Sequence, residues 1–169
     1  MSLRQGYLLQ ALHQALHAAL PGKCQGQLDS WMENGTLRLD PKDMGPTGAI
    51  LGYLSYQAVY TLEALPFRDC DPAVLLATVM AWLQDYDAER ERFELPDPAF
   101  SIEPNDEHSA DLELQVDFVE ALRLCPDEQG PIHWAGRRWV VMPYDLWVAE
   151  AALLQVGTLQ PPATIGGTP

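Results

Sequence analysis

Hydrophobic residues recur at helical spacing near the start of the chain, from residue 3 to residue 20. The positions that share one helical face are Leu9, Leu12, Leu16 and Leu20. Alanines between them favour the helical conformation, and Pro21-Gly22 interrupts it. The pattern predicts a helix over residues 3–20.

A second helical pattern covers residues 71–87. Asp71 is a favoured N-cap residue, and Pro72 suits the first helical position. The apolar stripe expected to face a sheet comprises Leu75, Leu76, Val79, Met80, Trp82, Leu83 and Tyr86. A third, short helix is predicted over residues 145–156, with Leu146, Ala149, Leu153 and Val156 on a common face.

Alternation of apolar and polar residues predicts two long strands, over residues 50–65 and 111–124. In the first strand one face should carry Ile50, Leu54, Tyr56, Tyr60 and Leu62. Gly52 within that strand indicates a bulge. In the second strand the apolar face should carry Leu112, Leu114, Val116, Phe118, Leu122 and Leu124. A hairpin is expected to join residues 132–134 and 138–141 around Ala135-Gly136.

The segments between these elements are richer in breakers and charges. A short amphipathic piece over residues 28–32 should end in a turn at Asn34-Gly35, followed by a short strand over 36–39. Residues 41–48 and most of 88–110 read as loops, because both contain several prolines.

This order of elements predicts an α+β fold: a small, mainly antiparallel sheet packed against two or three helices. The length of 169 residues fits one domain. We assign residues 1–156 to that domain. Residues 157–169 are expected to form a flexible tail, because they contain three prolines and three glycines and no apolar period.

Charge changes the picture of possible partners. The net charge is −14, and residues 86–169 hold sixteen of the 24 acidic side chains. A basic surface that grips nucleic acid is therefore not expected. The acidity suits either solubility or a passage through which DNA slides without binding. The first twenty residues are too polar for a secretory leader or a membrane span, so we expect a cytoplasmic protein.

Two residue sets resemble metal or disulfide motifs. His13 and His17 have the spacing that lets two histidines on a helix share a metal. Gln14 stands where a zinc protease has its glutamate, and no third ligand is evident, so no metal is expected. The three cysteines, Cys24, Cys70 and Cys125, are odd in number and unclustered, which predicts reduced thiols.

A small hydrolase using carboxylates of residues 85–120 is an alternative function from a different class. On the strand over 111–124, however, the acidic residues Asp111, Glu113, Asp117 and Glu120 are explained as one solvated face. Motifs for a nucleophile or for phosphate binding are missing from the sequence. We expect no catalytic residues, no cofactor and no enzymatic activity.

Arg137-Arg138 lies between Trp134 and Trp139, which superficially suggests stacking on nucleic acid. In an acidic half of the chain, a salt bridge or a contact with a neighbouring subunit is the favoured interpretation. Trp82 is expected in the core. The remaining tryptophans, Trp31, Trp134, Trp139 and Trp147, favour a protein interface.

Several blocks together carry a family resemblance. They are Leu20-Pro21, Leu28 to Gly35, Leu54 to Leu62, Phe67-Arg68-Asp69, Asp71-Pro72 and Met80 to Gln84. In content and order they resemble the tail completion protein R (GpR) family of contractile-tailed temperate phages. The likeness covers roughly residues 8–125. The segment after residue 125 and the proline-containing loop 41–48 depart from the family pattern.

The resemblance implies a structural role in the virion tail, assembled in the host bacterial cytoplasm. It implies a tail terminator: a homo-oligomer, expected to be a hexameric ring, that caps the tail tube and allows head–tail joining. Tube subunits, sheath subunits and neck proteins are the implied partners, with no specific nucleic-acid binding and no membrane. A neck or head–tail connector protein is the alternative within virion assembly.

Overall fold

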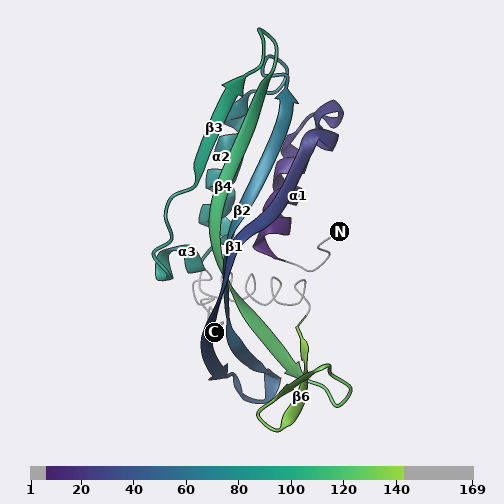
Figure 1. Cartoon of the computed structure of the whole chain (residues 1–169), viewed down its shortest axis with the longest axis vertical. Coiled ribbons are helices and arrows are strands. Elements are labelled where there is room, and N and C mark those ends of the chain that lie inside the picture. Colours follow the sequence, from purple (N-terminus) through teal and green to yellow (C-terminus); the bar gives the residue numbers. More distant parts are fainter. Residues whose placement is uncertain (1–6, 143–169) are drawn as a thin grey trace, which may run out of the picture.

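The protein is built around one long, twisted antiparallel sheet (Figure 1). The structure is a computed structural model and describes residues 7–142. The strands are β1 (Leu28–Asp43), β2 (Ala49–Leu65), β3 (Ala99–Pro104), β4 (Ala110–Pro126), β5 (Ile132–Trp134) and β6 (Arg137–Val141). Their order is β1-β2-β4-β6-β5, and β3 pairs with the first part of β4.

The helices are α1 (Leu8–Ala19), α2 (Pro72–Tyr86) and α3 (Glu89–Arg92), with short 3₁₀ turns η1 (Gly22–Gln27) and η2 (Gly45–Thr47). Figure 1 shows α1 and α2 behind one half of the sheet, while the strands cross at a waist and continue beyond the reach of these two helices. An α+β fold with a mainly antiparallel sheet is thus confirmed in outline, with more strand than the sequence predicted. The helix expected over 145–156 and the tail expected over 157–169 lie outside the described residues.

Two names for these halves follow from the strand register. The helical half comprises residues 7–35, 56–88 and 96–118. The distal half comprises residues 36–55 and 119–142. It begins at the row of the sheet in which Ser55 pairs with Thr36 on one side and with Val119 on the other. Residues 89–95 pass between the two halves.

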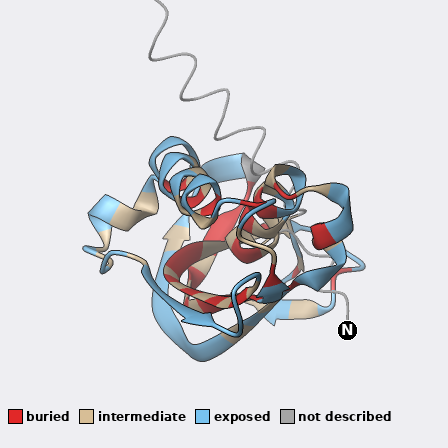
Figure 2. Ribbon diagram, turned by 90° about the horizontal axis from the view of Figure 1, so that it is seen from above, coloured by how far each residue is buried: buried red, intermediate tan, exposed pale blue. Residues whose placement is uncertain are grey.

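The main core lies between α1, α2 and one face of the sheet, where buried residues gather in Figure 2. The predicted leucines of α1 are all buried, and so are Leu75, Val79 and Leu83 of α2. From the sheet, the same cluster receives Tyr56, Ala58, Tyr60, Leu62, Leu112, Leu114, Val116 and Phe118. Burial of so much apolar surface supplies the main stabilisation of the helical half.

The sequence correctly predicts where α2 begins, but it predicts that too many of its apolar residues face the sheet. The Asp71 side chain accepts a hydrogen bond from the Ala73 amide at 2.9 Å, as expected of an N-cap. Met80, however, is exposed, and Trp82 is only half-buried, with its ring edge-on to Phe118 at 6.3 Å between centroids. Trp82 therefore packs against the core, as expected, but at its edge, because the face of α2 that the sheet covers is narrower than the apolar stripe.

Asn34-Gly35 is a bulge inside β1 and not a turn. The register of β1 against β2 shifts between Glu33 and Thr36, and the strand then continues to Asp43. Asn34 has a φ of 53°, a left-handed conformation that asparagine tolerates well. The predicted loop over 41–48 is correspondingly shorter, because continuous pairing with β2 extends the strand.

A second bulge changes which residues of β2 share a face. The register against β4 shifts between Ile50 and Gly52, close to the position predicted from Gly52. As a result Ile50 packs with Tyr53 on the face opposite Tyr56, and the prediction that Ile50 and Tyr56 share a face is wrong. A Cβ at Gly52 would lie 2.3 Å from the Arg38 carbonyl oxygen, so only glycine fits there.

The predicted loop over 88–110 contains α3 and the edge strand β3. Between them the chain passes around the edge of β4, where an Arg90 guanidinium N–H donates to the Asp117 carbonyl at 2.7 Å. Phe93 and Leu95 then pack beside Tyr53 on the face of the sheet opposite α1 and α2. The prolines of this segment flank β3 at Pro98 and end it at Pro104, which fits an edge strand.

Candidate functional site

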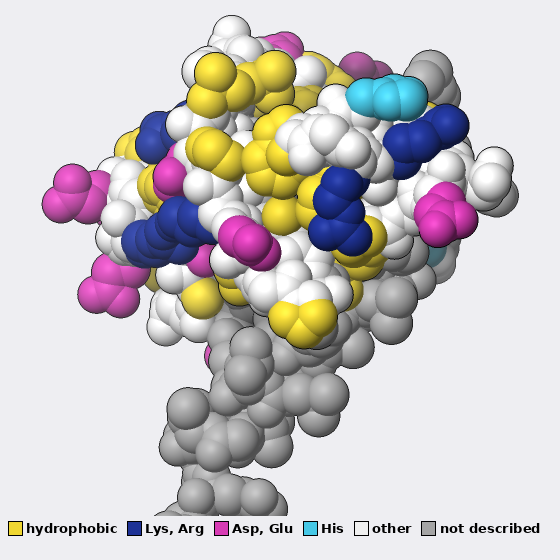
Figure 3. All heavy atoms as spheres, turned by 90° about the horizontal axis from the view of Figure 1, so that it is seen from below, with side chains coloured by type: hydrophobic (Ala, Val, Ile, Leu, Met, Phe, Trp, Pro, Cys, Tyr) yellow, Lys and Arg dark blue, Asp and Glu magenta, His cyan; other side chains and the backbone are white. Residues whose placement is uncertain are grey.

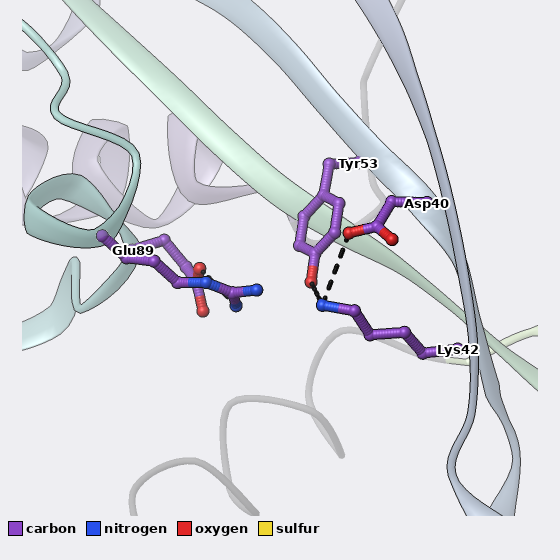
Figure 4. A network of polar contacts seen from close by, with 5 residues as sticks. Asp40, Lys42, Tyr53 and Glu89 are labelled. Atoms are coloured by element: carbon purple, nitrogen blue, oxygen red, sulfur yellow. Dashed lines mark hydrogen bonds and ion pairs between the residues drawn. The ribbon is translucent and has the colours of Figure 1, made fainter.

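An aromatic and cationic group of side chains occupies the waist of the sheet, on the face without α1 and α2 (Figure 4). We call it the waist cluster; its members are Arg38, Lys42, Tyr53, Arg92 and Phe93. Tyr53 and Phe93 pack edge to face at 5.1 Å between ring centroids. The three cations pack against these two rings.

Each cation of the waist cluster lies over a ring. The Arg38 guanidinium carbon is 5.4 Å from the Phe93 centroid, and that of Arg92 is 5.0 Å from the same centroid. The Lys42 ammonium donates to the Tyr53 hydroxyl at 3.3 Å and lies 5.5 Å from its ring centre. Ring faces attract cations, so these contacts limit how far the charged groups move.

Two carboxylates form ion pairs with cations of the waist cluster and leave these cations partly exposed. Lys42 lies 3.4 Å from Asp40, and Arg92 lies 3.2 Å from Glu89. The hydrogen bond to Tyr53 is the first cause that raises the pKa of Lys42. The side chains of Lys42 and Arg92 are 39% and 50% exposed, so both cations remain available to a partner.

In the helical half, the sheet face opposite α1 and α2 is acidic instead of cationic. Its strands place carboxylates at Glu63, Glu103, Asp111, Glu113 and Asp117. We call this set the acidic face. The first four line a hollow of about 210 Å³ together with Thr61 and Ser101. Among residues 7–142, none of these five carboxylates forms an ion pair with a lysine or arginine.

Within the acidic face, Glu103 and Asp111 are direct cross-strand partners. Like charges at such positions destabilise a sheet. Asp111 is nevertheless held ionised, because hydrogen bonds from the Ala64 amide and the Asn105 side chain lower its pKa. Asp111 therefore keeps its negative charge, and the acidic face has no lysine or arginine partner within the described chain.

The two halves of the molecule differ in charge. The helical half carries fourteen acidic residues (Asp or Glu) and two basic residues (Lys or Arg). The distal half carries five acidic and five basic residues. Seen from the distal end, hydrophobic side chains and Lys or Arg lie side by side (Figure 3). The exposed apolar residues of the distal half are Leu37, Leu39, Met44 and Val141.

Glu120 departs most from the sequence interpretation. It was expected on a solvated face with Asp111, Glu113 and Asp117, yet it is 1% exposed. Its position is even along β4, which is the parity of the buried Phe118, whereas the other three acids are odd. Burial, helped by the nearby charge of Asp87, raises the pKa of Glu120 to about 7.

The buried Glu120 carboxyl has a structural role at the start of α1. It accepts hydrogen bonds from the Tyr56 hydroxyl and, at 2.7 Å, from the Leu8 amide. The helix has no local side-chain cap, so this carboxyl from β4 satisfies one of its free amides. Tyr60 adds a bond from its hydroxyl to the Leu9 carbonyl at 2.8 Å.

The histidines and cysteines that could bind a metal or form a disulfide do not come together in one site. His13 donates to or accepts from Ser30 Oγ at 2.8 Å, and burial is the first cause that lowers the pKa of His13. His17 is exposed one turn further along α1. Within residues 7–142 no group of three or more His, Cys, Asp or Glu side chains is arranged to hold a metal ion. Cys24, Cys70 and Cys125 are free thiols.

Arg137 and Arg138 lie at the expected hairpin between β5 and β6. Arg138 donates to the Gly130 carbonyl at 2.8 Å, and Arg137 lies over the Trp139 ring at 5.2 Å. Trp139 is buried against Trp134 and donates to its carbonyl at 2.8 Å. These tryptophans form a small core of the distal half instead of an exposed stacking surface.

Sequence reasoning missed the waist cluster entirely. Its members come from β1, β2 and the segment after α2, and nothing in their spacing indicates that they meet. The one available signal was the parity of Tyr53, which falls opposite Tyr56 on β2. An aromatic on the polar face of a strand points to a partner on that face.

The fold and these surfaces define the class: a small structural protein whose twisted sheet leaves strand edges and charged faces exposed. The P2 phage tail completion protein R (GpR) family model matches residues 6–143, and the chain belongs to this family. It is therefore a structural phage tail completion protein, a component of the virion tail with tail-associated partners, and not an enzyme.

One relative is a protein of Haemophilus phage HP1 (strain HP1c1) named as an uncharacterized 19.2 kDa protein in the rep-hol intergenic region. It is 29% identical over 143 residues, which cover 85% of this chain and 86% of that protein. No solved structure matches the chain. None of the helices between residues 7 and 142 is long and apolar enough to cross a membrane.

Proposed function

We propose that the chain is a tail-terminator subunit, which closes into a ring on the last ring of the tail tube and stops its growth. Membership of the tail completion family over residues 6–143 is the observation that carries this proposal. We expect the ring to be hexameric, with one face that matches tube or sheath subunits and another that receives the neck. Such a ring would be added in the host cytoplasm before head and tail join.

Exposed strand edges support a role in assembly. Among the described residues, the outer edges of β1, β3 and β5 have no partner strand. Unpaired backbone groups on such edges are ready to extend a neighbouring sheet. A ring needs one heterologous contact that repeats around its axis, and distinct free edges on each copy suit that requirement.

Exposed leucines on the distal half support contact with the tube. Leu37 and Leu39 of β1 are 68% and 90% exposed, side by side on one edge strand. Two neighbouring exposed leucines suit an apolar contact with another subunit. The net charge of −14 in turn suits a channel through which DNA passes without binding.

The test is a phage that lacks this protein. We expect heads and tails that do not join, and tails of irregular length, both restored by supplying the wild-type chain. Tails of normal length that join heads would contradict the proposal. Binding of the purified protein to isolated heads but not to tube ends would instead favour a neck protein.

A pair of variants locates the contact with the tube. Leu37→Asp with Leu39→Asp should abolish binding to tube ends, because two charges would enter an apolar interface. Val74→Asp changes another exposed apolar residue, on α2 in the helical half, and serves as the control. Equal binding by both variants would exclude the distal leucines from the tube contact.

A further inference from the structure

We propose that the waist cluster of one copy binds the acidic face of the next copy. Arg38, Lys42 and Arg92 would project into the carboxylates that surround the hollow formed by β2, β3 and β4. The contact rests on the proposed ring, because a homo-oligomer is what brings the two surfaces together. It names the partner of each surface as a second copy of this chain.

The acidic face supplies the first reason. Four carboxylates, Glu63, Glu103, Asp111 and Glu113, share one hollow of about 210 Å³, and no lysine or arginine among residues 7–142 pairs with any of them. Glu103 on β3 and Asp111 on the neighbouring β4 are even direct cross-strand partners. A cation from outside would relieve this repulsion.

The waist cluster supplies the second reason. Its cations are held on the Tyr53 and Phe93 rings, so little side-chain freedom remains to be lost on binding. Lys42 and Arg92 keep exposed surface beyond their contacts with Asp40 and Glu89. Both features are those of a cationic surface arranged in advance for an acidic partner.

Charge distribution favours a second copy as that partner. Two helical halves set side by side would place fourteen acidic residues against fourteen, with two basic residues in each. Setting the distal half of one copy against the helical half of the next removes this repulsion, because the distal half carries as many basic as acidic residues. The attraction then comes from the cations of the waist cluster, which would face the carboxylates directly. Both surfaces lie on the face of the sheet opposite α1 and α2 but at different positions along the strands, so a contact between them is heterologous and can repeat from copy to copy.

A mixing experiment tests the contact directly. The first variant carries Arg38→Glu and Arg92→Glu, and the second carries Glu63→Arg and Glu113→Arg. Each variant alone places like charges at the contact and should self-associate at least about tenfold more weakly than wild type, measured by native mass spectrometry. Mixed together, the variants restore opposite charges at every contact and should associate as wild type does.

Arg68→Glu is the matched control, since it reverses an exposed arginine of the helical half outside both surfaces. It should leave self-association unchanged. Circular dichroism confirms that each variant folds. Folded variants that associate normally alone, or that fail to associate when mixed, would overturn the proposal.

Cross-linking of the wild-type chain gives an independent readout. The sequence contains only two lysines, Lys23 and Lys42, so a carbodiimide, which couples amines to carboxylates, has few sites. A mixture of light and nitrogen-15-labelled protein, alone and bound to tube ends, should give mixed-isotope links from Lys42 to the acidic face. Lys42→Arg keeps the charge and should abolish them.

The two proposals can fail separately. Links from Lys42 that join only Asp40 within one copy, on tube ends as well as in solution, would overturn this contact and leave the tail-terminator role standing. Charge-dependent association without binding to tube ends, or closure into an isolated pair, would support the contact and contradict the tail-terminator ring.

Discussion

The Tyr56 hydroxyl on β2 donates a buried hydrogen bond to the Glu120 carboxyl on β4, directly beneath the first turn of α1. The same hydroxyl accepts from the Leu9 amide at 3.2 Å, so two strands and a helix meet at this pair. An unpaired carboxyl would be costly in such a place, whereas this one caps a helix. The pair therefore links the position of α1 to the register of the sheet.

Glu120 makes stability depend on pH. Its pKa rises from an ordinary 4.5 to about 7 on folding, because burial disfavours the ionised form. Folding then favours the protonated carboxyl, so its contribution is complete below pH 4.5 and is lost as the pH rises through 7. From pH 4.5 to pH 8 the free energy of unfolding should fall by up to about 3 kcal/mol from this group alone.

The check on Glu120 is chemical denaturation of wild type and Glu120→Gln across that pH range. The neutral amide cannot ionise, so the variant should lose much of the decrease. Glu91→Gln removes a carboxyl from the exposed side of α3 and is the matched control. Parallel curves for wild type and Glu120→Gln would show that Glu120 does not carry the effect.

Gly52→Ala should destabilise the sheet by about 1–3 kcal/mol, the usual cost of forcing an extra carbon into packed structure. The added Cβ would lie 2.3 Å from the Arg38 carbonyl oxygen, which belongs to the strand paired with it. Gly26→Ala meets nothing within 4 Å and serves as the control. Equal unfolding midpoints for the two variants would mean that β1 moves aside without cost.

Phe118→Ala should cost about 3–5 kcal/mol of unfolding free energy, the range for a fully buried large aromatic. Trp82→Ala should cost less, about 1–3 kcal/mol, because the indole is half-buried at the edge of the same core. Met80→Ala, on the exposed side of α2, should be near neutral. A larger loss for Trp82→Ala than for Phe118→Ala would contradict this order.

A chain ending at residue 156 should retain the stability of the full chain to within about 1 kcal/mol. The basis is the proline and glycine content of residues 157–169, whose apolar residues follow no helical or strand period. Denaturation of both chains under the same conditions provides the comparison. A lower midpoint for the shorter chain would show that these last residues stabilise the domain.

Local patterns in the sequence determined much of the fold. The leucines of α1, the Asp71 cap of α2 and the alternation along β4 each depend on neighbours within a few residues, so periodicity was sufficient to predict them. The hairpin of β5 and β6 was equally local. Even the family resemblance rested on such blocks, and the family match confirmed it.

Tertiary structure decided the rest, because the remaining features join segments far apart in the chain. Whether Asn34 begins a turn or a bulge depended on continuous pairing with β2, and the bulge at Gly52 decided the face of Ile50. Glu120 became a buried helix cap only when α1 packed over β4. The waist cluster, likewise, exists because residues 89–95 carry Arg92 and Phe93 around the sheet edge to Tyr53, a path set by packing and by no local pattern.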